Sequence, residues 1–169
     1  MKLIWYMLIL LLFVPVQSLL MPSISLNGIQ PDLGVILLYF IGLVYGELDG
    51  LLLGSLIGFL MDLFSGGSLG ANLVSKALVG WGSGMIGRTV LNVNAFFTLG
   101  SVFGLSLLNG LLSFLFVYLI TGGWGFWASF RWVIAPEAFY NAILATVLFL
   151  LISRSIEAAR LKSQGFSLP

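Results

Sequence analysis

Residues 31–70 read PDLGVILLYFIGLVYGELDGLLLGSLIGFLMDLFSGGSLG, and this stretch decides the fold that the sequence predicts. Its glycines recur every fourth residue, at Gly42, Gly46, Gly50, Gly54 and Gly58. Small residues four apart form a groove on one helix face, along which a second helix can approach closely in a membrane. We expect the glycines to pack the helices over 32–46 and 48–64 closely. Alternatively, some of them, or the glycines of 80–84 and 100–104, face a helix of a partner.

The composition of the 169 residues is typical of an integral membrane protein. Sixty per cent of the residues are hydrophobic and only 8% are charged. A hydrocarbon core of ~30 Å needs ~20 apolar residues per helix, so the chain has room for five or six spans and no soluble domain. The absence of Cys and His removes thiolate nucleophiles, disulfides and the commonest metal ligand. A net charge of +1 argues against nucleic-acid binding.

The hydrophobic pattern predicts an all-α bundle, one polytopic membrane domain over residues 1–169. We expect helices over about 3–21, 32–46, 48–64, 69–87, 95–121 and 133–153, followed by a polar tail over 154–169. Residues 22–31 and 122–132 are expected to be loops. A single helix over 33–64 is rejected because it would place Glu47 and Asp49 at the bilayer centre.

The distribution of basic residues sets the expected topology. With six spans and both termini inside, the cytoplasmic side receives Lys2, Arg88, Arg154, Arg160 and Lys162, and the outer side receives Arg131. This asymmetry follows the positive-inside rule. We therefore expect both termini to be cytoplasmic.

Lys76 falls within the fourth expected helix, where an ionisable group is costly and is normally paired. Asp62, near the end of the preceding helix, is the first candidate partner in an intramembrane ion pair. Asp32, expected at the same outer level, is the second candidate. Alternatively, Asp62 caps the turn through the amides of Ser65 or Gly66, and Lys76 extends outward to water.

Pro31 and Asp32 form a helix-start pattern, and Pro136 and Glu137 repeat it before the last span. Proline has the φ angle that a helix entry needs, and a carboxylate there favours the positive end of the helix dipole. Helix capping alone would explain both pairs.

Asn109 and Asn141 fall well inside expected spans. Because lipid offers no hydrogen bonds, we expect both amides to point at other helices and to bond there. No serine is accompanied by a base, and no phosphate-binding loop follows a strand. The sequence therefore predicts neither a catalytic site nor a cofactor.

Three motifs of this chain resemble the bacterial rod shape-determining protein MreD family. They are Pro31-Asp32-Leu33 at a helix start, the segment 58–66 with Asp62, Ser65 and Gly66 that leads to Gly70, and the segment 136–141 that opens with Pro136-Glu137. Lys76 departs from this resemblance, since the family usually has an uncharged residue near that position.

The resemblance implies a non-enzymatic scaffold in the bacterial inner membrane, within the machinery that builds lateral peptidoglycan. It implies MreC as a direct partner, and MreB, RodZ, RodA and the elongation-specific penicillin-binding protein as members of one complex. It also implies a fold similar to the six-helix substrate-binding subunits of energy-coupling-factor transporters. Contacts with membrane lipids are expected, and a homodimer is left open.

A second function stays open beside the scaffold. On this reading the chain is a small-molecule-binding subunit of a transporter, with Asp32, Asp62 and Lys76 lining a solute or lipid pocket near the outer face. Co-purification of an MreC-like protein would favour the scaffold, whereas a coupling subunit or a bound solute would favour the transporter.

Overall fold

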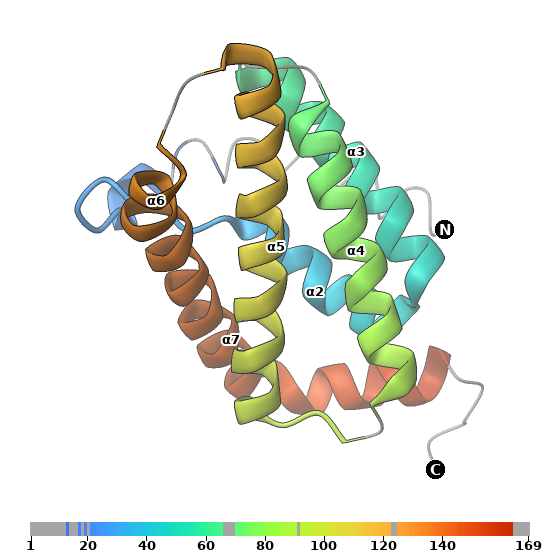
Figure 1. Ribbon diagram of the computed structural model, residues 1–169. Helices are drawn as coiled ribbons and strands as arrows, with labels where there is room; N and C mark the ends of the chain where they lie inside the picture. Colours follow the sequence, from blue (N-terminus) through green and yellow to red (C-terminus); the bar gives the residue numbers. More distant parts are fainter. Residues whose placement is uncertain are drawn as a thin grey trace.

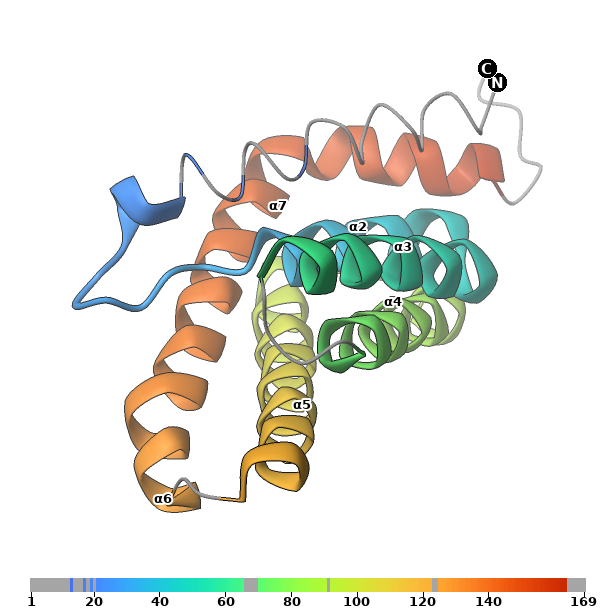
Figure 2. The same ribbon diagram turned by 90° about the horizontal axis from the view of Figure 1, so that it is seen from above.

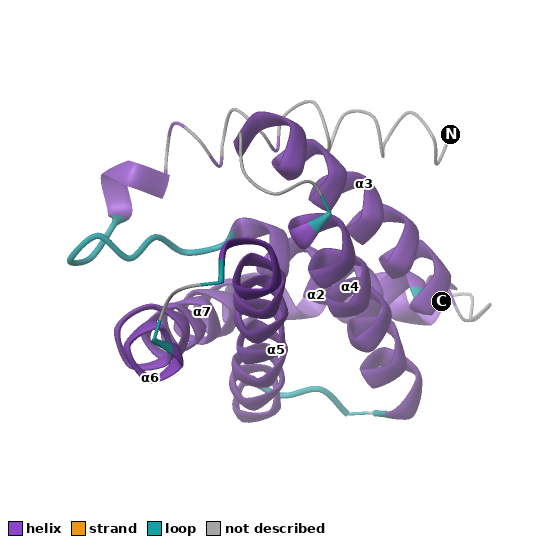
Figure 3. Ribbon diagram, turned by 45° about the horizontal axis from the view of Figure 1, so that its top comes forward, coloured by secondary structure: helices purple, strands orange, loops and turns teal. Residues whose placement is uncertain are grey.

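The computed structural model describes residues 13, 17, 19, 21–65, 70–90, 92–122 and 125–163 (Figure 1). Its long helices are α2 (Leu33–Tyr45), α3 (Glu47–Ser65), α4 (Ala71–Thr89), α5 (Ala95–Thr121) and α7 (Ala135–Ser163). Three short elements accompany them: η1 (Met21–Ile24) precedes α2, while α6 (Phe126–Ser129) and the π-helical turn η2 (Phe130–Ile134) lie between α5 and α7. The described part of the chain contains no strand (Figure 3), which confirms the all-helical prediction for it. The helix expected over 3–21 lies largely outside the described residues.

Helix α2 is the most deeply buried of these helices. The side chains of Val35, Leu38 and Tyr39 are fully buried, and α2 packs against α3, α4, α5 and α7. Figure 2 shows α2 and α3 side by side above α4, while α5 and α7 run along the neighbouring side. The start of α2, at Asp32, therefore lies where the other helices converge.

The glycines of α3 pack against α4, which runs antiparallel to it (Figure 1). A Cβ atom at Gly50, Gly54 or Gly58 would overlap the backbone carbonyl of Gly80, Lys76 or Asn72, respectively. The three contacts follow one another at intervals of one helical turn. Only glycine permits this approach, since any side chain would push the helices apart.

Glycine in α2 also approaches α4. A Cβ atom at Gly42 would lie 2.6 Å from Ser83 Cβ and 2.7 Å from the Gly84 amide nitrogen. The expected packing between the helices of 32–46 and 48–64 is present, since a Cβ atom at Gly50 would lie 3.4 Å from Gly42 Cα, but the main partner of these glycines is α4. Gly46 has another role: its φ of 94° ends α2, and nothing lies within 4 Å of a Cβ atom there.

Two helices in the described part of the chain are long and apolar enough to cross a membrane. They cover Ala95–Ile120 and Phe126–Ile156, and Leu33–Tyr45 is a shorter apolar helix. Six spans therefore remain a prediction.

The expected loop over 122–132 is wrong in its second half, because the helical backbone begins at Phe126. Proline lacks an N–H group, and its ring collides with the carbonyl four residues earlier in an α-helix. In this chain the proline is Pro136, and the π turn η2 ends two residues before it. The Ala135 amide donates to the Phe130 carbonyl, five residues earlier. The wider turn accommodates Pro136, so the helix continues past it instead of starting there.

The polar tail expected over 154–169 is also corrected, since α7 continues to Ser163. Its sequence there, RSIEAARLKS, is rich in good helix formers and holds no glycine or proline. Figure 1 shows that the red, C-terminal part of α7 runs in a different direction from its orange-brown part.

The expected loop over 22–31 is present, with a short 3-10 turn at its beginning. Leu26 and Ile29 exchange both backbone hydrogen bonds at 2.9 Å, around Asn27 and Gly28. Both central residues have positive φ angles, 52° and 83°. Asn-Gly is the pair that suits such a tight turn.

Candidate functional site

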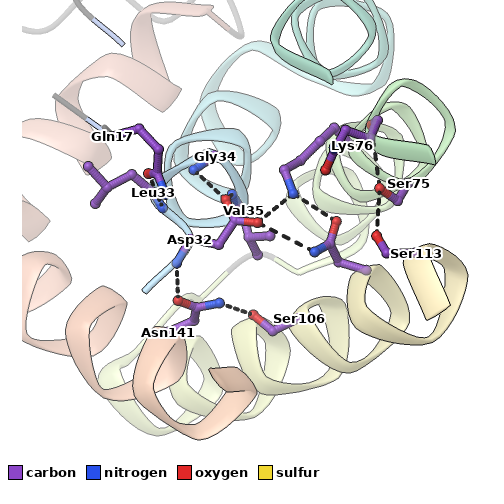
Figure 4. A network of polar contacts seen from close by, with 12 residues as sticks. Gln17, Asp32, Leu33, Gly34, Val35, Ser75, Lys76, Ser106, Ser113 and Asn141 are labelled. Atoms are coloured by element: carbon purple, nitrogen blue, oxygen red, sulfur yellow. Dashed lines mark hydrogen bonds and ion pairs between the residues drawn. The ribbon is translucent and has the colours of Figure 1, made fainter. Parts of the chain in front are cut away.

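Asp32 begins α2 and is the centre of a buried polar network (Figure 4). Its Oδ1 accepts hydrogen bonds from the amides of Gly34 at 2.9 Å and Val35 at 3.3 Å. The predicted capping role is therefore confirmed. Its Oδ2 accepts a hydrogen bond from Lys76 Nζ at 2.5 Å, so both carboxylate oxygens are engaged.

Lys76 reaches this site from the second turn of α4, and its side chain is only 1% exposed. Its Nζ also donates to Asn109 Oδ1, on α5, at 2.9 Å. The Asn109 Nδ2 donates in turn to Asp32 Oδ2 at 3.4 Å. The three side chains thus link α2, α4 and α5. A Cβ atom at Gly34 would lie 3.0 Å from Lys76 Cε, so glycine leaves room for the lysine stem.

Asn141 connects α7 to the same network. Its Oδ1 accepts from the Asp32 amide at 2.7 Å, and its Nδ2 donates to Ser106 Oγ, on α5, at 3.2 Å. The expectation that Asn109 and Asn141 bond to other helices is confirmed. Ser106 was not predicted, because a serine in an apolar helix can bond to its own backbone and gives no distinct signal.

Gln17 forms hydrogen bonds with the backbone of the residues before and after Asp32. It donates from Nε2 to the Pro31 carbonyl at 3.3 Å and accepts at Oε1 from the Leu33 amide at 3.1 Å. Sequence reasoning also missed this residue. A glutamine within the first apolar segment was the signal that could have identified it.

Asp62 forms a second polar centre, at the connection from α3 to α4. Its two oxygens accept from the amides of Gly70 at 2.8 Å, Asn72 at 3.0 Å and Leu73 at 3.0 Å, and from Asn72 Nδ2 at 3.0 Å. It thereby satisfies amides at the start of α4, which no helical carbonyl can reach. Gly70, with a φ of 104°, turns the chain into α4.

The predicted Asp62–Lys76 ion pair is therefore corrected to Asp32–Lys76. The proposed outward extension of Lys76 is wrong as well, since the side chain is buried. Asp62 does cap, but it caps the amides at the start of α4. Ser65 is the last residue of α3, and Gly66 lies outside the described residues.

A cavity of about 400 Å³ borders the Asp32 network, between α5 and the helical segment η2–α7. We call it the α5–α7 cavity. Its polar lining residues are Asp32, Asn72, Asn109, Ser113, Ser129 and Glu137. Its apolar walls include Phe114, Val117, Tyr118, Val133 and Ile134.

A second cavity of about 400 Å³ lies beside the first, under the loop that precedes α2. Asp32, Val133 and Glu137 line both cavities. The structure therefore brings the predicted residues Asp32, Lys76 and Glu137 to one region, while Asp62 and Gly70 stand at another. In the described part of the chain, no three carboxylates are grouped so that they could hold a metal ion.

Comparison with known protein families identifies what the chain is similar to. The family model of the rod shape-determining protein MreD matches residues 1–156. No curated protein and no solved structure matches the chain. The matched range includes the Pro31-Asp32-Leu33 turn, the Asp62 cap and the Pro136-Glu137 pair. Because the match covers most of the 169 residues, the chain belongs to the MreD family of rod shape-determining proteins.

Proposed function

We propose that this protein is a non-enzymatic scaffold of the bacterial rod complex in the inner membrane. It binds MreC and connects the MreB filament and RodZ with RodA and the elongation-specific penicillin-binding protein. The observation that carries the proposal is the family match over residues 1–156, which assigns the chain to rod shape determination. We also propose that the chain crosses the membrane six times with both termini in the cytoplasm. A fold like that of energy-coupling-factor substrate-binding subunits belongs to the same proposal.

The use of the charged residues supports a scaffold. Asp32 and Lys76 hold α2, α4 and α5 together, and Asp62 holds the start of α4. A fully satisfied buried polar network makes a bundle rigid and specifies one packing arrangement. Rigid helices with partner-facing surfaces are what a scaffold needs.

The exposed face of α5, which points away from the bundle, is suited to dock a partner helix. Nothing lies within 4 Å of a Cβ atom at Gly100 or Gly104, in contrast to the packed glycines of α3. Phe96 and Leu108 continue the same exposed face one turn on either side. Two glycines four residues apart allow a neighbouring span to approach closely in lipid. We propose that the single span of MreC packs against this face.

The test is co-purification of MreC with the tagged protein from the native membrane in mild detergent. We expect stoichiometric recovery with the parent protein and strong loss with Gly100→Leu/Gly104→Leu, because the leucines fill the groove without disturbing the bundle. Ala128→Leu, at an exposed small residue of α6, is the matched control and should retain MreC. No recovery with the parent protein would contradict the scaffold, and full recovery with the double variant would exclude the α5 face.

The α5–α7 cavity favours a second candidate, a small-molecule-binding subunit of a transporter. The same purification separates the two functions. A transporter subunit would bring down a coupling subunit and no MreC.

A further inference from the structure

We propose that the α5–α7 cavity is a binding site for a membrane phospholipid with a primary ammonium headgroup, and that Glu137 accepts the ammonium. The inference goes beyond the scaffold function and does not depend on it.

The cavity has polar residues at its inner end and apolar residues at its outer edge. Asp32 and Asn109, at the inner end, are buried. Val117, Tyr118 and Val133, at the outer edge, are exposed at the surface of the bundle. A pocket with a few convergent polar groups and mostly apolar walls is the usual form of a ligand site. This gradient matches an amphiphile whose head enters first and whose chain stays beside the outer apolar edge.

Among the charged groups at the cavity, the carboxylate of Glu137 is available to bind a ligand. Asp32 is paired with Lys76, so these two charges balance. Glu137 lines both cavities, and neither cavity has a lysine or arginine among its described lining residues. A carboxyl group in such a partly buried position becomes fully ionised only when a cation or hydrogen-bond donors compensate its charge. An ammonium group provides both, in charge-assisted hydrogen bonds that are stronger than neutral ones.

The level of the cavity corresponds to the lipid headgroups. Trp127 and Trp132, on α6 and η2, are among the most exposed aromatic side chains and stand on the segment that forms one wall. Tryptophan is enriched at membrane interfaces, where one part of the ring is apolar and the other wet. Ser129, on the same segment, lines the cavity and can donate a hydrogen bond to a phosphate oxygen.

The volume limits what enters. About 400 Å³ is near the small end of ligand pockets, which suits a headgroup with a short stretch of chain and not a whole lipid. The acyl chains would remain in the bilayer beside the exposed apolar residues at the outer edge. A lipid is therefore favoured over a water-soluble amine, which would leave that edge unused.

The experiment titrates the purified full-length protein in mild detergent with three dioleoyl phospholipids. Phosphatidylethanolamine carries the primary ammonium, phosphatidylcholine carries a cation without N–H donors, and phosphatidylglycerol carries no cation. Lipid retention is measured by native mass spectrometry. We expect phosphatidylethanolamine to bind about tenfold more tightly than the other two, as a charge-assisted hydrogen bond provides.

Glu137→Gln keeps the shape of the side chain and removes its charge, so this preference should disappear. Glu47→Gln is the matched control. Glu47, the first residue of α3, pairs with Arg88 of α4 and does not line the cavity. Val133→Trp provides an independent variant, because an exposed tryptophan at the outer edge should block retention while Glu137 stays in place.

Three results would overturn the proposal. They are equal retention of phosphatidylethanolamine and phosphatidylglycerol by the parent protein, a preference that survives Glu137→Gln, and binding of free ethanolamine as tight as that of the lipid. The last result would assign the site to a soluble amine.

Discussion

Lys76 Nζ lies 2.5 Å from Asp32 Oδ2, although 44 positions separate the two residues along the chain. The pair joins the first residue before α2 to the second turn of α4, and both side chains are buried. Asn109 contacts both partners, so the pair also positions α5. The polar network thus holds together helices whose apolar surfaces alone would allow several packings.

Removal of one member of this pair should destabilise the protein strongly. We expect Lys76→Met or Asp32→Asn to cost about 3–5 kcal/mol, because an uncompensated charge remains in the bundle. The double variant should be less destabilised than the sum of the single variants. The free energies come from reversible unfolding in detergent. Additive losses would show that the two residues act independently.

The same cycle with Asp62→Asn in place of Asp32→Asn serves as the control. Asp62 accepts its hydrogen bonds from the backbone amides at the start of α4, so its loss should be nearly additive with Lys76→Met. Strong coupling between Asp62 and Lys76 would restore the pair that the sequence first indicated.

Asp62→Asn should loosen the start of α4 more than the rest of the bundle. The variant loses the negative charge that attracts the amides of Gly70, Asn72 and Leu73. The expected loss is about 1.5–3 kcal/mol, the usual range for hydrogen bonds to a charged group. Hydrogen exchange should accelerate at these three amides before it does in α5. Uniform acceleration along the chain would contradict a local capping role.

Alanine at Gly54 and at Gly100 should have opposite effects. The Cβ atom at Gly54 would overlap the Lys76 carbonyl, so the substitution should cost about 1–3 kcal/mol or more through overpacking. The Cβ atom at Gly100 meets open space, and alanine is favoured over glycine in a helix by up to about 1 kcal/mol. Melting temperatures in detergent compare the two. Similar values would show that α3 and α4 can separate without loss.

The sequence predicted the helices where apolar runs end at glycines, prolines or charges. The bounds of α4 and α5 agree closely with expectation, since Arg88 and Asn94 border the polar connection between them. The helical backbone over 126–134, just before α7, was missed because a proline usually marks a helix start, and a π turn that accommodates it leaves no pattern in the sequence. Its end was mistaken because polar residues were interpreted as a tail although they favour helix.

The sequence identified the charged residues of the site, but it placed the wrong carboxylate first as the partner of Lys76. Burial of Lys76 demanded a carboxylate, and the sequence offered Asp62 and Asp32 at similar depths. The choice depended on which helix faces α4 at the lysine, and chain order cannot provide that. Lys76 pairs with Asp32 because Gly34 leaves space for the lysine stem, while Asp62 already accepts hydrogen bonds from the amides at the start of α4.

The topology can be tested because the natural chain contains no cysteine. Leu26 precedes α2 and Leu48 follows it, and both side chains are exposed. With the termini in the cytoplasm, Leu26→Cys should react with a membrane-impermeant maleimide from the outside, and Leu48→Cys should react only after permeabilisation. Yet the 13 residues of α2 extend about 20 Å at 1.5 Å per residue, less than a hydrocarbon core of ~30 Å. If both cysteines react from one side, α2 is a re-entrant helix; if they react from opposite sides, the bilayer must thin around α2 or the flanking turns must lie inside it.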